Sequence, residues 1–115
     1  MSRNWTRTAC LIVLHASVRF GVTEAVAQGP LPDAARGKSI AERSCSACHI
    51  TGPNATGPVV PGIPPFTAIA NLPGQSAERI AGKIIIPHPL MPALSLTMSE
   101  VRDLSGYIVS LRTAP

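Results

Sequence analysis

Apolar residues recur at helical spacing in several parts of this 115-residue chain, and no strand-like alternation of any length appears. The clearest stripe lies near the C-terminus, where apolar side chains are spaced three or four residues apart: Val101, Leu104, Ile108 and Leu111. Just before this stripe, Thr97 and Glu100 have the spacing of a capping box. The pattern predicts a last helix that opens at Thr97 and runs to about Leu111.

Two further helices are predicted upstream, each behind a capping residue. Asp33 can cap a helix over residues 34–44, whose inner face would be Ala34, Gly37, Ile40 and Ala41. Ser76 can cap a helix over residues 77–85, which Pro87 ends and whose inner face would be Ile80, Ala81 and Ile84. With no strand pattern between them, these segments predict an all-α fold.

Gly37 is unusual inside the first of these helices. A glycine in a helix interior costs about 1 kcal/mol relative to alanine. We expect the compensation to be the close approach of another helix, which a side chain at this position would prevent.

Prolines interrupt the helical patterns in two places. Residues 51–65 contain five prolines and are predicted to form a loop, followed by a single helical turn over residues 66–71. A long loop of this kind in a small domain usually surrounds a functional site. The second place is an extended segment around Met91, which Pro89 and Pro92 hold stiff from both sides.

Residues 1–27 have the order of a secretory signal peptide. Two arginines precede a short apolar run over residues 9–18, and a small-residue cleavage site, Ala-Val-Ala, follows at residues 25–27. The run is shorter than the roughly 20 apolar residues that span a bilayer. We therefore expect residues 1–27 to be removed and residues 28–115 to form one domain in the periplasm. An uncleaved N-terminal anchor facing the periplasm is the alternative.

The charge of the chain gives no sign of a nucleic-acid partner. The net charge is +4, but three arginines and one glutamate lie in residues 1–27, so the rest of the chain carries only +2. No basic stripe with interleaved aromatic residues appears. Beyond residue 27 the aromatic side chains are only Phe66 and Tyr107. A chain this short has difficulty burying enough apolar surface by itself, and a bound apolar cofactor would supply what is missing.

The most informative motif is Cys45-Ser46-Ala47-Cys48-His49, a C-x-x-C-H string. This order is the attachment signature of a c-type haem. The two thiols add across the two vinyl groups of one porphyrin, and the adjacent histidine falls under the iron as its proximal ligand. The motif therefore predicts one covalently attached haem c, held by Cys45 and Cys48 and ligated by His49.

Taken together, the motifs resemble those of a small class I cytochrome c. The matching pieces follow the family's order over nearly the whole of residues 28–115: Gly37, Cys45-x-x-Cys48-His49, Pro64-Pro65-Phe66, His88-Pro89-Leu90-Met91-Pro92 and Leu104-x-x-Tyr107-Ile108. The resemblance implies three to four helices wrapped around one haem, with the N- and C-terminal helices crossing. It also implies that a proline-loop carbonyl accepts a hydrogen bond from the second nitrogen of His49, with Pro58 and Pro61 as the candidates.

The distal iron ligand is expected to be Met91. A thioether is a soft, neutral donor that raises the reduction potential, and it must reach the iron on a stiff segment. Met98 is the rival methionine, but its place in the first turn of the last helix favours a core position. His88 would give bis-histidine ligation, and we expect it instead at the surface near the haem edge.

These residues favour a periplasmic electron-transfer protein over an enzyme. The iron would cycle between Fe(II) and Fe(III), and redox partner proteins such as a dehydrogenase, a cytochrome complex or a terminal oxidase would exchange electrons with it. Contact with a membrane is expected only through partners, unless the N-terminal segment stays attached. The basic residues of the helices are expected on ordinary solvated faces, with partner docking as the alternative role: Lys38, Arg43, Arg79 and Lys83.

Two other functions remain open at this stage. A haem enzyme or a gas-binding cytochrome would need a sixth iron position that is open or easily vacated, against which Met91 argues. A zinc or thiol-redox protein would need further ligands at suitable spacing or a βαβ context, and the sequence offers neither.

Overall fold

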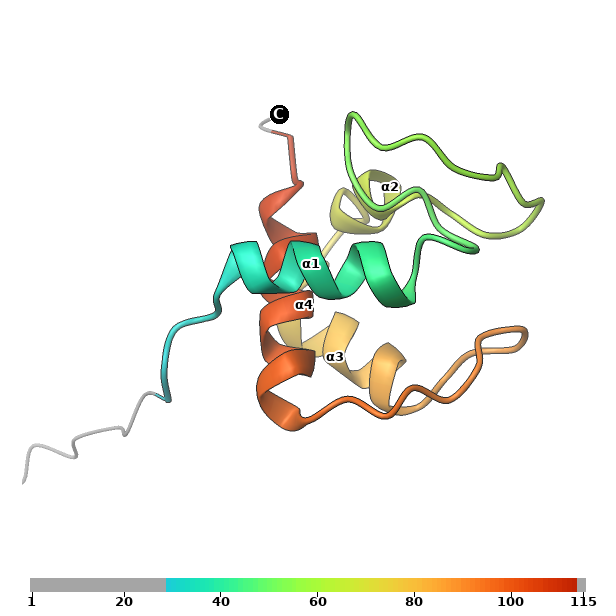
Figure 1. The fold of residues 1–115 in the computed structure, drawn as a ribbon. Coiled ribbons are helices and arrows are strands. Elements are labelled where there is room, and N and C mark those ends of the chain that lie inside the picture. Colours follow the sequence, from blue (N-terminus) through green and yellow to red (C-terminus); the bar gives the residue numbers. More distant parts are fainter. Residues whose placement is uncertain (1–28, 114–115) are drawn as a thin grey trace, which may run out of the picture.

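The computed structural model describes residues 29–113, which form four helices joined by loops (Figure 1). They are α1 (Ala34–Ser44), α2 (Phe66–Ala70), α3 (Ala77–Ile85) and α4 (Met98–Ser110). Within these residues there is no strand, so the predicted all-α fold is confirmed. The predicted signal peptide over residues 1–27 lies outside the described residues. No helix between residues 29 and 113 has the length and apolar character needed to cross a membrane.

The three longer helices begin at the residues that the sequence indicated. The side chains of Asp33, Ser76 and Thr97 each accept a hydrogen bond from the backbone N–H three residues further on. At Thr97 the capping box is complete, because the Glu100 carboxylate in turn accepts from the Thr97 N–H at 2.8 Å. These bonds satisfy backbone donors that have no partner inside the helix, so they fix where each helix starts.

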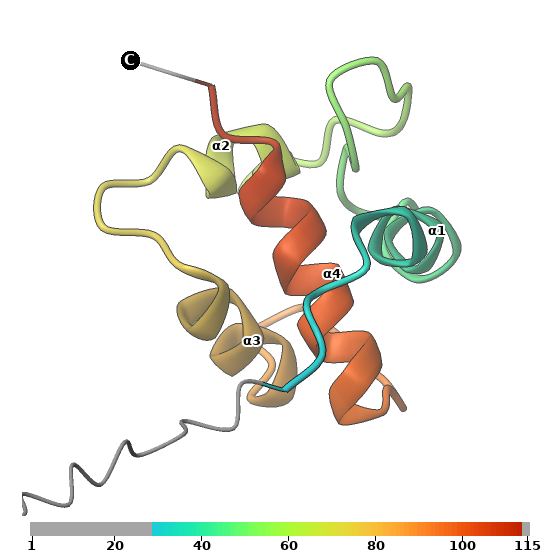
Figure 2. The same cartoon turned by 90° about the vertical axis from the view of Figure 1, so that its left-hand side faces the viewer.

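Helix α4 is the centre of the fold and packs against each of the other three helices. Figures 1 and 2 show α1 crossing it at a steep angle, with α2 and α3 near its two ends. The buried core combines residues from all four helices: Ile40, Ala41, Cys45, Phe66, Ala70, Ile80, Ile84, Val101, Leu104, Tyr107 and Ile108. Ala34 is exposed, so its predicted place on the inner face of α1 is wrong, because this first turn precedes the crossing.

The crossing of α1 and α4 depends on Gly37. A β-carbon at this position would lie 2.1 Å from the Asp103 carbonyl oxygen and 2.7 Å from the Tyr107 β-carbon. Both distances are well below van der Waals contact, so a side chain would force the helices apart. The expected close approach is confirmed.

A buried carboxylate, for which the local sequence pattern held no signal, also ties α1 to α4. Asp103 is fully buried, accepts a hydrogen bond from the Asp33 N–H at 3.0 Å and forms an ion pair with Arg36. Burial alone would favour the neutral acid, but the Asp33 N–H and the Arg36 guanidinium outweigh it and hold the pKa of Asp103 below its ordinary value. The carboxylate therefore stays ionised and links the two helices at the N-terminal end of α1.

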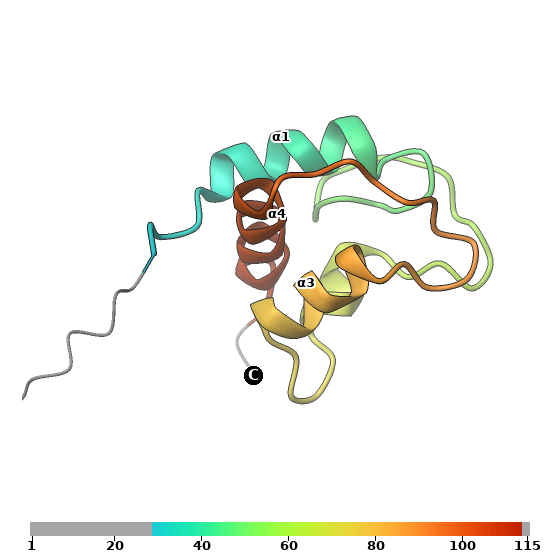
Figure 3. The same ribbon diagram turned by 90° about the horizontal axis from the view of Figure 1, so that it is seen from below.

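Two loops extend from the helices toward the same side of the molecule. Figure 3 shows residues 51–65 and residues 86–97 at the end of the molecule opposite residues 29–33, which precede α1. The first loop is closed at its base, where the Phe66 N–H donates to the Ile50 carbonyl at 2.9 Å. The second loop leaves α3 and returns to the capped start of α4. The region between these loops and the helices contains the candidate site.

Candidate functional site

The C-x-x-C-H string forms a tight turn directly after α1. Cys45 closes the helix by donating its N–H to the Ala41 carbonyl at 2.9 Å. Its own carbonyl accepts hydrogen bonds from the Cys48 N–H at 3.1 Å and from the His49 N–H at 2.9 Å. The turn therefore holds both cysteines and the histidine close together at the end of a rigid helix.

These residues border two cavities, of about 340 Å³ and about 90 Å³. The larger one lies in the usual size range for a small-molecule or cofactor site. Both cavities are lined by Cys45, His49, His88 and Met91. The rest of the larger cavity is mostly apolar, with walls from α2, α3 and α4: Phe66, Ile69, Leu72, Ile80, Ile84, Leu104 and Ile108. Among the residues that line this larger cavity, Lys83 is the only lysine, arginine, aspartate or glutamate.

The orientation of the His49 ring is set by a proline carbonyl, but not by either proline that the sequence suggested. His49 Nδ1 lies 2.8 Å from the Pro64 carbonyl oxygen, so neither Pro58 nor Pro61 has this role. The closed base of the loop explains the difference, since the bond between residues 50 and 66 places Pro64 next to His49. A carbonyl can only accept, so Nδ1 carries the proton and Nε2 keeps a lone pair.

Phe66 is a further neighbour of His49, and its role at the site had not been assigned from the sequence. The centroids of the two rings lie 5.2 Å apart, with the planes tilted by 44°. Phe66 is buried and begins α2 immediately after Pro64 and Pro65. The Pro-Pro-Phe string was the available signal, and it supplies both the carbonyl and the ring that orient the histidine.

Both cysteines of the motif are free thiols in this structure. Cys45 is buried in the core cluster, while Cys48 is partly exposed and borders the smaller cavity. Burial raises the pKa of the Cys45 thiol to about 11, because it disfavours the charged thiolate. Cys45 is therefore a neutral thiol at physiological pH and lies beside the cavity, where it can be joined to a cofactor.

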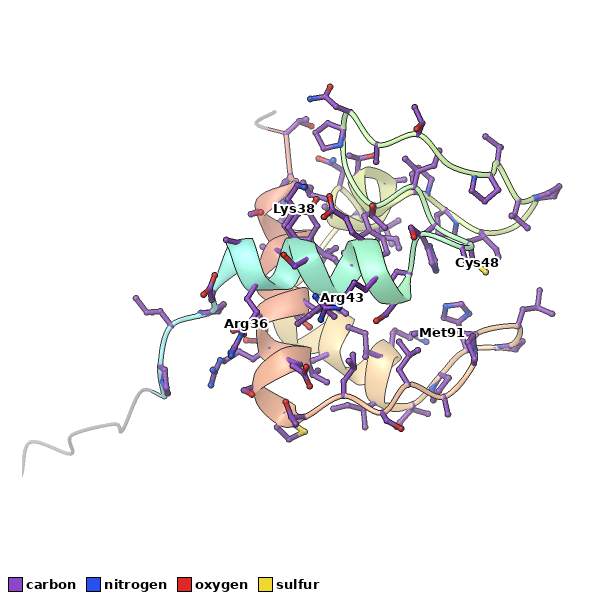
Figure 4. The ribbon with its side chains drawn as sticks, viewed as in Figure 1. Arg36, Lys38, Arg43, Cys48 and Met91 are labelled. Atoms are coloured by element: carbon purple, nitrogen blue, oxygen red, sulfur yellow. The ribbon has the colours of Figure 1, made fainter. Side chains whose placement is uncertain are left out.

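The second loop brings Met91 to the same cavities. Figure 4 shows Cys48 and Met91 on the same side of the molecule, between the two loops. Met91 is half-buried, and its N–H donates to the His88 carbonyl at 3.0 Å in a turn that Pro89 occupies. Met98 is 70% exposed, so its predicted core position is wrong, because the first turn of α4 projects beyond the packed part of the fold.

His88 lies deeper than a surface histidine. It is half-buried and lines both cavities, and its ring centroid is 6.4 Å from that of His49. The Nδ1 atom of His88 lies 3.0 Å from the Pro89 carbonyl. Met91 and His88 therefore both border the space that a metal ion bound to His49 would occupy.

The residues around the cavity fit a covalently attached haem. They offer two thiols three residues apart, an imidazole with a free Nε2, a thioether on the facing loop and an apolar wall. The two thiols can bond to a porphyrin's vinyl groups, the imidazole and the thioether are suitable iron ligands, and the apolar wall would exclude water from a bound macrocycle. Packing of the protein alone does not explain this arrangement, because the cavity interrupts the core.

The comparisons with known proteins agree with this site. No protein-family model matches the chain, and no solved structure matches it. Among curated proteins, cytochrome c-552 from Bradyrhizobium diazoefficiens is 33% identical to it over 106 residues, which cover 92% of this chain and 94% of that relative. Because this likeness extends over nearly all of both chains, the chain belongs to the class I c-type cytochromes, and it is an electron-transfer protein rather than an enzyme.

Proposed function

We propose that this protein is a periplasmic one-electron carrier with a single haem c. Cys45 and Cys48 would hold the haem through thioether bonds, His49 would be the proximal iron ligand and Met91 the distal one. The observation that carries the proposal is the bond between His49 Nδ1 and Pro64, which leaves Nε2 free beside a cavity that Met91 also lines.

The protein's own residues would position the cofactor and keep it dry. When bound, the haem supplies a one-electron Fe(II)/Fe(III) couple. The Pro64 carbonyl fixes the tautomer and the ring orientation of His49, so that the Nε2 lone pair is available to the iron. The aliphatic residues of α3 and α4 exclude water, and Lys83 offers a positive charge to the carboxylate groups of the cofactor.

For the distal position, the geometry leaves a choice between Met91 and His88. Met91 lies between Pro89 and Pro92, so its segment has little freedom to swing away from the cavity. A His/Met pair also raises the reduction potential of the iron, which suits an electron carrier. The Nδ1 atom of His88 lies 3.0 Å from the Pro89 carbonyl, whereas the turn that presents Met91 is closed by the backbone carbonyl of His88, which a substitution of the side chain keeps.

The proposed location rests on the sequence pattern of residues 1–27. Signal cleavage would leave residues 28–115 as the carrier domain, which meets membranes only through its redox partners. Covalent attachment of haem after export requires free thiols, and Cys45 and Cys48 form no disulfide.

Optical spectra of the haem-loaded protein test the ligands. Met91→Ala is expected to keep the haem attached but to give an iron that binds carbon monoxide rapidly at neutral pH and has a lower potential. His88→Ala is the matched control and should keep the closed, low-spin spectrum of the parent protein. An unchanged spectrum in Met91→Ala together with an open iron in His88→Ala would assign the distal position to His88. Rapid carbon monoxide binding by the parent protein would reject the carrier function.

A further inference from the structure

A tight turn presents Met91, and its conformation follows from two observations. The Met91 N–H donates to the His88 carbonyl at 3.0 Å, which closes a four-residue turn. Pro89 and Leu90 are its central residues, and the φ of Leu90 is +73°, the one positive value at a non-glycine residue between 29 and 113. Because the ring of Pro89 keeps its own φ negative, this combination is a type II turn.

Leucine is an unfavourable residue at this place in a type II turn. The third position needs a positive φ, which glycine and asparagine adopt at little cost. The β-carbon of any other residue lowers the population of this conformation by roughly five- to thirtyfold. A turn of the peptide between Pro89 and Leu90 would give a type I turn, which keeps the closing hydrogen bond and a negative φ. A contact outside the turn must therefore hold the type II form.

The packing of the protein does not supply this contact. Leu90 is 86% exposed, so no buried apolar area offsets the strain of its backbone. Leu90 nevertheless borders the cavity of about 90 Å³, as do Cys48, His49 and Met91. These three neighbours are residues that would hold the cofactor, so a bound macrocycle would lie against the Leu90 side chain.

We propose that Leu90 is a positioning residue for the distal ligand: contact of its side chain with the bound cofactor holds the turn in the type II form that presents Met91. This inference rests on the proposed haem attachment and on the proposed ligation by Met91. Two opposing effects meet at Leu90, because the side-chain contact favours the ligating form and the backbone strain disfavours it. Loss of the contact alone should loosen Met91, and relief of the strain should tighten it again.

Displacement of Met91 by imidazole in the oxidised, haem-loaded protein tests the proposal. Titration followed by optical spectra gives an apparent affinity for imidazole, which rises when Met91 is held less firmly. Leu90→Ala keeps the strain and loses most of the contact, so it should raise this affinity about tenfold, as partial exposure of three aliphatic carbons predicts. Leu90→Gly also loses the contact but relieves the strain, so its affinity should return to within about threefold of the parent value.

The order of the two variants separates this role from simpler ones. If the side chain provided apolar contact alone, glycine would loosen Met91 at least as much as alanine does, and that order would overturn the proposal. An unchanged imidazole affinity in Leu90→Ala would overturn it as well, since the side chain would then contribute nothing to the position of Met91.

Val59→Ala is the matched control. Val59 is an aliphatic residue on the other loop that is 85% exposed, but it borders neither cavity and its φ is not positive. Its substitution should change the imidazole affinity by less than about twofold. Equal effects of Val59→Ala and Leu90→Ala would indicate a general loss of stability and would reject the positioning role.

The proposed function is judged on the parent protein alone. A low-spin spectrum with thioether ligation and a reversible one-electron couple upholds the carrier function whatever the Leu90 variants show. If the parent protein passes and the alanine and glycine variants do not differ as expected, only the positioning role is overturned. A parent protein without thioether ligation would reject Met91 as the ligand, and the role of Leu90 with it.

Discussion

Replacing Gly37 with alanine tests the central packing contact of the fold. The added β-carbon would lie 2.1 Å from the Asp103 carbonyl oxygen and 2.6 Å from its carbonyl carbon. These are backbone atoms of α4, so no side-chain rotation can relieve the overlap. Ordinary contact begins near 3.4 Å, and α1 and α4 must therefore separate by about 1.3 Å at the crossing.

The magnitude follows from two opposing effects. Overpacking a well-packed interior costs about 1–3 kcal/mol, and a backbone overlap belongs at the upper end of this range. Alanine is favoured over glycine in a helix by about 1 kcal/mol, which offsets part of the cost. The net loss in the free energy of unfolding is about 2 kcal/mol, equivalent to a fall in Tm of roughly 8–16 °C for a domain of this size.

The assay is thermal and denaturant unfolding of the haem-loaded protein, followed by far-ultraviolet circular dichroism. Gly82→Ala is the matched control, since Gly82 lies in α3 and no atom beyond its chain neighbours and its own helix backbone stands within 4 Å of the place that its β-carbon would take. That variant should gain about 1 kcal/mol, a rise of roughly 4–8 °C. If Gly37→Ala were as stable as Gly82→Ala, the close crossing of α1 and α4 would be wrong.

Two other substitutions probe the contacts that hold the helices and loops together. Asp103→Asn should cost about 1.5–2 kcal/mol near pH 7, because the neutral amide weakens the hydrogen bonds that the buried carboxylate accepts from the Asp33 N–H and from Arg36, whose half-exposed guanidinium stays solvated. The folded pKa of Asp103 lies below its ordinary value, so the stability it contributes is present above the unfolded-state pKa near 3.9 and is lost as the pH falls through the folded value. Denaturant midpoints measured from pH 7 downward should therefore fall from about pH 5 in the parent protein and less steeply in Asp103→Asn; parallel curves would contradict this role. Tyr107→Phe should cost about 1–2 kcal/mol, since it removes the 2.8 Å bond from the Tyr107 hydroxyl to the buried Thr51 carbonyl. Amide exchange near residue 51 should accelerate in Tyr107→Phe, and unchanged protection there would refute the assigned contact.

The helices of this protein were predictable because their signals are local. The caps at Asp33, Ser76 and Thr97 and the apolar spacing behind them each lie within a few residues, and the observed helices begin where these signals lie. The motif from Cys45 to His49 was equally local, since its meaning depends on spacing along one turn. Gly37 favoured a close helix crossing, because a close approach is one way to offset the cost of a glycine inside a helix.

The errors arose where the answer depends on residues distant in sequence. Pro64 rather than Pro58 or Pro61 meets His49 because a hydrogen bond between residues 50 and 66 closes the loop at its base. Met98 was expected to pack in the core, but it is exposed because the first turn of α4 projects beyond the neighbouring helices. Such outcomes follow from how the loop and helices are placed in space, which spacing along the chain does not reveal.

The sequence by itself determined that this chain forms helices around a C-x-x-C-H motif and belongs with the class I cytochromes c. Only the tertiary structure decided which groups meet. It placed Asp103 at the helix crossing, turned the His49 ring against Pro64, and brought residues 51–65 and 86–97 together around the cavity. The physical reason is that helix starts and covalent motifs depend on neighbouring residues, whereas buried ion pairs, ring orientation and exposed surfaces depend on contacts across the whole fold.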